Sequence, residues 1–161
     1  MIRKFLAIVL SIFSLGVKAA QPYTLFASIS AEKLDCWASH YLDFTEIVGY
    51  SSLGHFFLKN PNSNEYIVLH PFKQAAKSYG TFSSLAEFET SVLNEPGFAE
   101  YVLRPQHVAA IRERIGPLKE DEIYIPQPYP FLGGSEAPNT YEKGNVWVFI
   151  DIVGQMAGVC E

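Results

Sequence analysis

Cysteine and histidine are scarce in this sequence, and their spacing excludes several kinds of site. The 161 residues include two cysteines and four histidines, namely Cys36, Cys160, His40, His55, His70 and His107. No two of the cysteines and no two of the histidines have the spacing of a metal-binding motif. Gly133-Gly134 lacks the Lys-Ser/Thr pair of a phosphate-binding loop. The sequence therefore predicts neither a metal site nor a cofactor.

An apolar run long enough to span a bilayer is also lacking. Phe5 to Val17 is apolar except for Ser and Gly, but it is shorter than the roughly 20 residues that a spanning helix needs. Arg3 and Lys4 precede it, and Val17-Lys18-Ala19 ends it in the manner of a signal-peptidase site. The pattern predicts a signal peptide at 1–19, a single domain at 20–161 and a periplasmic location without a stable membrane anchor after cleavage. An uncleaved N-terminal anchor is the alternative.

Basic side chains are fewer than acidic ones. Removal of residues 1–19 leaves nine Lys and Arg against 17 Asp and Glu, a net charge near −8 with neutral His. Such a charge disfavours binding to nucleic acid or to anionic membranes, and it favours a basic protein partner. The simpler interpretation is that the charge keeps an exported protein soluble.

The two cysteines allow two interpretations. In an oxidising compartment an even number of cysteines favours a disulfide. A Cys36–Cys160 bridge would tie the C-terminus to an early helix. Two unpaired cysteines, one buried and one on a frayed tail, remain the alternative.

The stretch from Gly49 to His70 predicts the organising element of the fold. Two apolar runs, Phe56–Leu58 and Tyr66–Leu69, flank a turn rich in Asn and Pro at 60–64, which is typical of a β-hairpin. We expect a loop at 49–54 before it. Upstream, 23–29 is predicted to be an edge strand or a lead-in, and Ser30 to cap a helix over 31–45.

Helices and an irregular segment are expected after the hairpin. The patterns predict a third short strand within 71–80, helices at 84–93, 98–103 and 105–115, and a packed, proline-rich segment at 117–145. The apolar residues of 146–153 predict a central strand with Trp147 buried. Together these elements predict an α+β domain whose central mixed or antiparallel sheet has helices on at least one face.

The residues that could do chemistry do not form a catalytic motif. Gly49-Tyr50-Ser51-Ser52-Leu53-Gly54 has the wrong spacing for a nucleophile elbow, and a strand follows it where the elbow needs a helix. The acidic run Glu120-Asp121-Glu122 is expected to stay solvated, where it suits contact with a basic partner better than acid–base catalysis. We predict that the protein is not an enzyme and has no catalytic residue.

Three segments in this order resemble a known family. They are GYSSLGHFFLKNPNSNEYIVLHP at 49–71, the helix at 84–93 and IGPLKEDEIYIPQPYPFLGG at 115–134. Over about 49–153 the chain resembles the C-terminal domain of the immunity proteins that neutralise a type VI secretion DNase effector, a domain often found after a GAD-like domain. Here the long N-terminal portion is replaced by a signal peptide and one helix.

The resemblance implies neutralisation of a cognate toxin by direct binding, without catalysis or cofactor. Because a DNase does not act in the periplasm, an exported member implies a toxin that works there. For the contact surface the sequence suggests Glu120, Asp121 and Glu122 with Tyr129 and Phe131 beside them. The alternatives are a small envelope enzyme that uses His55 or His70 with a nearby carboxylate, or a ligand-binding envelope protein.

Overall fold

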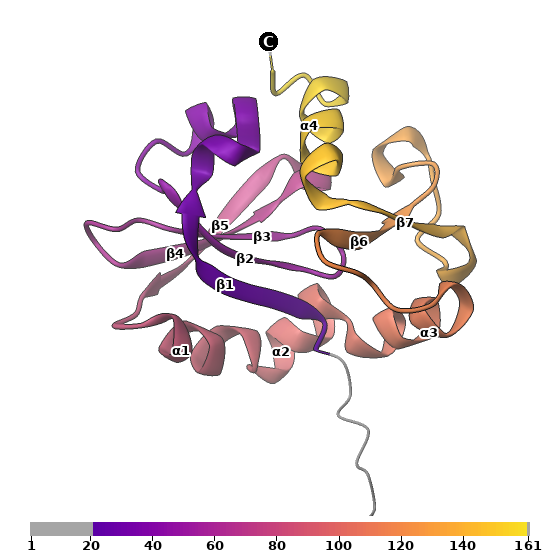
Figure 1. Cartoon of the computed structure of the whole chain (residues 1–161), viewed down its shortest axis with the longest axis horizontal. Coiled ribbons are helices and arrows are strands. Elements are labelled where there is room, and N and C mark those ends of the chain that lie inside the picture. The colour runs from indigo at the N-terminus through magenta and orange to yellow at the C-terminus, as the bar shows by residue number, and fades with distance from the viewer. Residues whose placement is uncertain (1–20, 161) are drawn as a thin grey trace, which may run out of the picture.

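The predicted hairpin lies at the centre of a five-stranded antiparallel sheet with the order β1-β2-β3-β4-β5 (Figure 1). The computed structural model describes residues 21–160. The strands of this sheet are β1 (Tyr23–Ser30), β2 (Glu46–Ser51), β3 (Phe56–Lys59), β4 (Glu65–His70) and β5 (Ala75–Thr81). The predicted α+β class with an antiparallel sheet is confirmed.

The hairpin has the predicted turn, and its two strands pair residue by residue. Phe56 pairs with Leu69 and Phe57 with Val68. At the tip, Asn60 Oδ1 accepts hydrogen bonds from the backbone N–H of Asn62 at 2.9 Å and of Ser63 at 3.3 Å. These bonds satisfy backbone donors that the turn would otherwise leave unpaired.

The loop expected at 49–54 is only partly correct, because Gly49 belongs to β2. Its place in a strand has a steric reason: a Cβ at Gly49 would lie 2.4 Å from the carbonyl oxygen of Thr24 in the neighbouring strand β1. Glycine therefore marks a close approach of two strands here. The turn between β2 and β3 is confined to residues 52–55.

Both faces of the sheet are covered, because side chains alternate between them along each strand. Phe56, Leu58, Ile67 and Leu69 belong to one buried cluster, which also contains Trp37, Phe149, Ile150 and Val153. Phe57, Tyr66 and Val68 belong to the other, with Phe88, Val92, Leu93, Phe98 and Leu103. The prediction of helices on at least one face is confirmed, and the sheet is the middle of three layers (Figure 1).

The layer below the sheet in Figure 1 contains the predicted helices. They are α1 (Leu85–Phe88) with its π-helical continuation η3 (Glu89–Leu93), α2 (Pro96–Phe98) with η4 (Ala99–Leu103), and α3 (Pro105–Ile115). Ser84 Oγ caps α1 by accepting from the backbone N–H of Glu87 at 3.1 Å. Stacking of Phe88 on Tyr66, with ring centroids 4.6 Å apart, fixes this layer to the sheet.

In the layer above the sheet, the structure differs from two predictions. The helix expected over 31–45 is a shorter 3-10 helix, η1 (Ala31–His40), interrupted at Asp35, which has φ +52°. The central strand expected over 146–153 is wrong, because these residues form the helix α4 (Val146–Met156). Asn145 starts that helix by accepting from the backbone N–H of Trp147 and Val148.

Helix α4 and η1 are joined twice. Cys36 and Cys160 form a disulfide with a Cα–Cα distance of 5.1 Å. Trp37 Nε1 donates to the carbonyl oxygen of Ile150 at 3.0 Å. The C-terminal helix is thus tied to the first helical segment of the chain across a separation of 124 residues.

The proline-rich segment contains a second, two-stranded sheet of β6 (Glu122–Pro126) and β7 (Tyr141–Asn145). The short 3-10 turns η5 (Pro130–Leu132) and η6 (Pro138–Thr140) lie between these strands, and η2 (Pro71–Lys73) links β4 to β5. The predicted signal peptide lies outside the described residues. Within 21–160 no helix has the length and apolar character needed to cross a membrane.

Candidate functional site

The acidic contact residues expected from the sequence lie in the turn that precedes β6. Glu120 is exposed there, whereas Asp121 and Glu122 are half-buried. Glu122 Oε2 accepts from the backbone N–H of Lys119 at 2.8 Å. The carbonyl oxygen of Asp121 accepts from the backbone N–H of Val146 at 2.8 Å. The acidic turn is therefore attached to the first residue of α4.

The two aromatic residues expected beside them lie elsewhere. Tyr129 is only 7% exposed, and Phe131 is half-buried against the same cluster. Both rings contact Phe72, at centroid distances of 5.5 and 5.9 Å. The five residues do not form one surface, because β6 separates the acidic turn from Tyr129, whose ring packs in the core.

Helix α4 carries an apolar stripe that the sequence analysis missed. Val148 is 56% exposed, Ile152 38% and Met156 51%. They follow one another at four-residue intervals and so share one side of the helix. The opposite side, which includes Val146, Phe149, Ile150 and Val153, packs in the core. Because this helix is apolar on nearly all sides, periodicity alone could not reveal the exposed stripe.

The stripe begins beside the acidic turn. Val148 is the third residue of α4, and the bond between Asp121 and Val146 fixes the turn at the same helix end. Acidic side chains at a helix N-terminus interact favourably with the helix dipole. We call the acidic turn (120–122) together with Val148, Ile152 and Met156 the α4 face. It combines exposed apolar side chains with negative charge.

Two of the histidines, His55 at the end of the β2–β3 turn and His70 at the end of β4, lie next to each other. The rings of His55 and His70 meet edge to face with centroids 4.8 Å apart. Burial, followed by the positive charges of neighbouring groups, lowers the pKa of both imidazoles, and that of His55 falls to about 3. Both rings are therefore neutral at pH 7.

Ser51 fixes the tautomer of His55. The Ser51 hydroxyl oxygen accepts from the backbone N–H of Leu53 at 3.2 Å and of His55 at 3.0 Å. With both lone pairs used, its hydrogen is donated to His55 Nδ1 at 2.9 Å. The proton of the neutral imidazole consequently resides on Nε2.

This Ser–His contact stabilises the turn and does not form a nucleophile. Ser51 is 0% exposed, so no substrate can reach its oxygen without the turn opening. Its two lone pairs serve the backbone of residues 52–55. The pair lacks the exposed, strained serine that acyl-transfer chemistry needs. Among residues 21–160, no group of three or more His, Cys, Asp or Glu side chains is placed to hold a metal ion.

The helical layer, the small sheet and α4 together match a known family. Residues 82–157 match the family model described as the T6SS immunity protein Tdi1, C-terminal. The resemblance to the C-terminal domain of type VI secretion immunity proteins is confirmed over these residues. The match begins after the central hairpin, so the segment at 49–71 lies outside it.

A solved structure with a similar fold is described as the crystal structure of Atu4351 from Agrobacterium tumefaciens. The TM-score is 0.57 at 13% sequence identity, and the similarity covers 84% of this chain and 67% of that one. At this identity the likeness concerns the fold alone. No curated protein sequence matches the chain.

Proposed function

We propose that this protein is an exported immunity protein that neutralises an antibacterial effector by binding it directly. The observation that carries the proposal is the match of residues 82–157 to the type VI secretion immunity family. That family points to a binding protein rather than an enzyme. The inaccessible hydroxyl of Ser51 is consistent with this conclusion.

Export is supported by the N-terminal pattern and by the disulfide. Arg3, Lys4, the apolar run and the Val17/Ala19 pair fit a cleaved signal peptide. Disulfides persist in oxidising compartments such as the periplasm, and Cys36 and Cys160 are paired. We therefore expect the mature protein to begin at Ala20 and its target to act in the periplasm.

The α4 face is our choice for the surface that contacts the effector. Stable interfaces combine a dry apolar centre with a charged rim that steers association. Val148, Ile152 and Met156 supply the apolar centre, and Glu120 with its acidic neighbours supplies the rim. The partner that fits this face is a protein with an apolar patch bordered by basic side chains, which also suits the acidic balance of the whole chain.

Co-expression in bacteria tests the proposal. The effector encoded beside this protein is directed to the periplasm, and survival is measured with and without the immunity protein. Protection should require residues 1–19 and should be lost in a Val148→Lys/Ile152→Lys variant, because two positive charges on the α4 face repel a basic partner. Both positions are exposed, so this variant should fold normally.

Ala109→Lys is the matched control. Ala109 is exposed on α3, in the layer on the opposite side of the sheet (Figure 1). This variant should protect as well as the unmodified protein. Protection that persists without residues 1–19, or a neighbouring gene product that is not toxic, would contradict the proposed function. Equal loss in both variants would contradict the choice of the α4 face.

A further inference from the structure

A cleft with charged and polar side chains in its lining lies between η2, the turn before β3 and the segment that follows η4. It consists of two adjoining cavities of about 190 and 160 Å³. Both are lined by Leu53, His55, Phe72, Lys73 and Glu136. His70 borders the first cavity and Arg104 the second. Each cavity can hold several water molecules or a small polar group.

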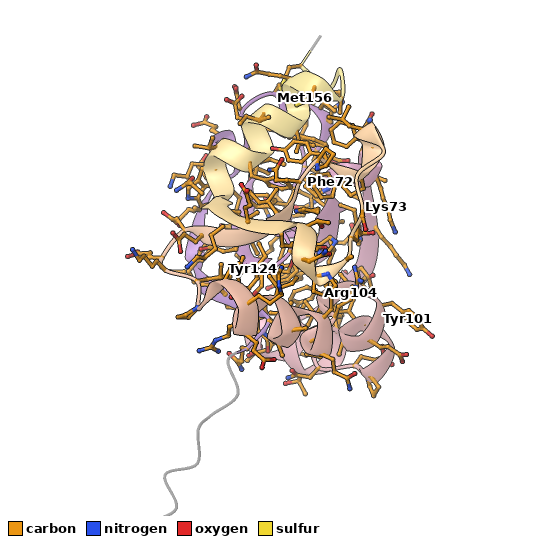
Figure 2. The ribbon with its side chains drawn as sticks, turned by 90° about the vertical axis from the view of Figure 1, so that its right-hand side faces the viewer. Phe72, Lys73, Tyr101, Arg104, Tyr124 and Met156 are labelled. Carbon is orange, nitrogen blue, oxygen red and sulfur yellow. A yellow bond between two sulfur atoms is a disulfide. The ribbon has the colours of Figure 1, made fainter. Side chains whose placement is uncertain are left out.

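Hydrogen-bond donors converge on this cleft from separate elements. Lys73 comes from η2, Arg104 follows η4, and His55 lies in the turn before β3. Figure 2 shows Phe72 and Lys73 above Arg104 and Tyr101 along one side of the molecule. An ammonium, a guanidinium and the Nε2–H of a neutral imidazole are donors that suit a carboxylate. Such a concentration of positive charge contrasts with the acidic composition of the chain.

Arg104 is held in an unusual backbone conformation. Its φ of +49° and ψ of +57° are left-handed, and Pro105 follows it directly. A non-glycine residue rarely adopts this region, and a residue before proline is further restricted. Backbone strain of this kind is concentrated at binding sites. The conformation ends η4 and starts α3 while Arg104 lines the cleft.

The cleft already contains one carboxylate, from the chain itself. Arg104 Nη1 lies 3.0 Å from Glu136 Oε1. Both side chains are partly exposed, and such ion pairs contribute little to stability. Glu136 is carried by the irregular segment between η5 and η6. An incoming carboxylate can therefore replace that of Glu136 beside Arg104.

We propose that this cleft is a binding site for a carboxylate, held by Lys73 and Arg104, with His55 and His70 also in its lining. Glu136 occupies the position beside Arg104 when the site is empty. The carboxylate belongs either to a small free acid or to an acidic side chain or C-terminus of a partner protein. This inference does not depend on the immunity function.

The electrostatics of His55 provide a direct readout. After burial, the largest causes of its lowered pKa are the neighbouring His70, Lys73 and Arg104. A bound carboxylate offsets the positive charges of Lys73 and Arg104, so it raises the pKa of His55. By linkage, protonation of His55 then tightens carboxylate binding by the same factor. Acetate is the simplest probe of this coupling.

NMR of the imidazole C–H signals tests the inference on the purified protein. Sodium acetate should shift the signals of His55 and His70 along a saturable curve, whereas sodium chloride at equal ionic strength should not. Lys73→Gln and Arg104→Asn should each weaken acetate binding by about threefold to tenfold, because each removes a charge-assisted hydrogen bond. Asn is chosen at 104 because it tolerates the left-handed region.

Two further variants complete the test. Glu136→Gln should strengthen acetate binding, since it removes the competing internal carboxylate. Lys119→Gln removes an exposed positive charge from the turn before β6 and should leave the binding curve unchanged. If acetate and chloride act alike, or if Lys119→Gln weakens binding as much as Lys73→Gln does, the inference is overturned.

Measurements of effector affinity distinguish the two possible sources of the carboxylate, a partner protein and a small free acid. If acetate lowers effector affinity, and Lys73→Gln lowers it too, the carboxylate belongs to the partner protein. If acetate binds but leaves effector affinity unchanged, the site takes a small free acid. Because the titration needs no effector, its failure is distinguishable from failure of the immunity function.

Discussion

At the scale of single residues, Gly154 lies where α4 packs against η1 and leaves no room for a larger side chain. A Cβ there would lie 2.6 Å from Trp37 Nε1 and 3.0 and 3.1 Å from the two disulfide sulfurs. Gly154→Ala improves intrinsic helix propensity by about 1 kcal/mol. We expect the overpacking to outweigh that gain and to lower the free energy of unfolding by about 1–3 kcal/mol.

Urea denaturation measures this effect, with Gln155→Ala as the control. Gln155 is exposed on the same helix, and its side chain bonds only to Asp151 among the described residues. The control should change stability by less than about 0.5 kcal/mol. A Gly154→Ala variant as stable as the parent protein would show that α4 can move away from η1 without cost.

The lowered pKa of His55 leads to a second prediction for a single residue, namely that the stability of the protein depends on pH. Its folded pKa of about 3 lies below the value of about 6.5 expected in the unfolded chain. Between these values the unfolded state binds a proton that the folded state does not, so stability falls as the pH falls. The slope approaches about 1.4 kcal/mol per pH unit for this one group.

Thermal or denaturant unfolding at several pH values between 7 and 5 checks this sign. In His55→Asn, whose Oδ1 can still accept from Ser51, the loss of stability on acidification should be smaller than in the parent protein. His70 and His107, whose pKa values are also lowered, account for a remaining slope. An identical slope in parent and variant would mean that His55 titrates normally in the folded protein.

At the scale of elements, α4 is where sequence reasoning failed. Val146 to Val153 is apolar at nearly every position and rich in β-branched residues, which suits a buried strand as well as a buried helix. The helix is started by Asn145 and held by Trp37 and the disulfide. Two of these contacts come from a segment more than 100 residues away, so no local pattern contains them.

Substitutions in α4 distinguish the helix from the predicted strand. Phe149 is 2% exposed and should cost about 3–5 kcal/mol when replaced by Ala. Trp147 is half-buried against Tyr50 and Phe56, so Trp147→Ala should cost less than Phe149→Ala. A strand would place these two residues on the same face and give them similar costs. Denaturant titration of both variants measures the difference.

Elements set by local signals were predictable. The hairpin follows from its turn residues, α1 from the cap at Ser84, and α3 from Pro105 and Gly116. The pairing of β6 with β7 was not predictable, because proline and glycine fill the segment between them and the partner strands lie apart in sequence. The α4 face and the cleft likewise depend on tertiary placement, and their residues carry no motif.

At the scale of the whole molecule, the disulfide joins the beginning and the end of the fold. It closes a loop with a sequence separation of 124 residues, and cross-links of this kind typically stabilise by about 2–4 kcal/mol. Cys36→Ala/Cys160→Ala should lose stability in that range. The loss is measured by urea denaturation, with the reduced parent protein as the comparison. If the variant and the reduced parent both unfold at the same urea concentration as the oxidised parent, the disulfide does not stabilise the fold.

The proposed function requires stoichiometric binding, and isothermal titration calorimetry of the mature chain with the neighbouring effector measures that binding. We expect a one-to-one complex with a micromolar or lower Kd, and an affinity reduced at least about tenfold by Val148→Lys/Ile152→Lys. Ala109→Lys should bind like the parent protein. Absence of any complex at micromolar concentrations, for an effector against which the protein nevertheless protects cells, would contradict neutralisation by direct binding.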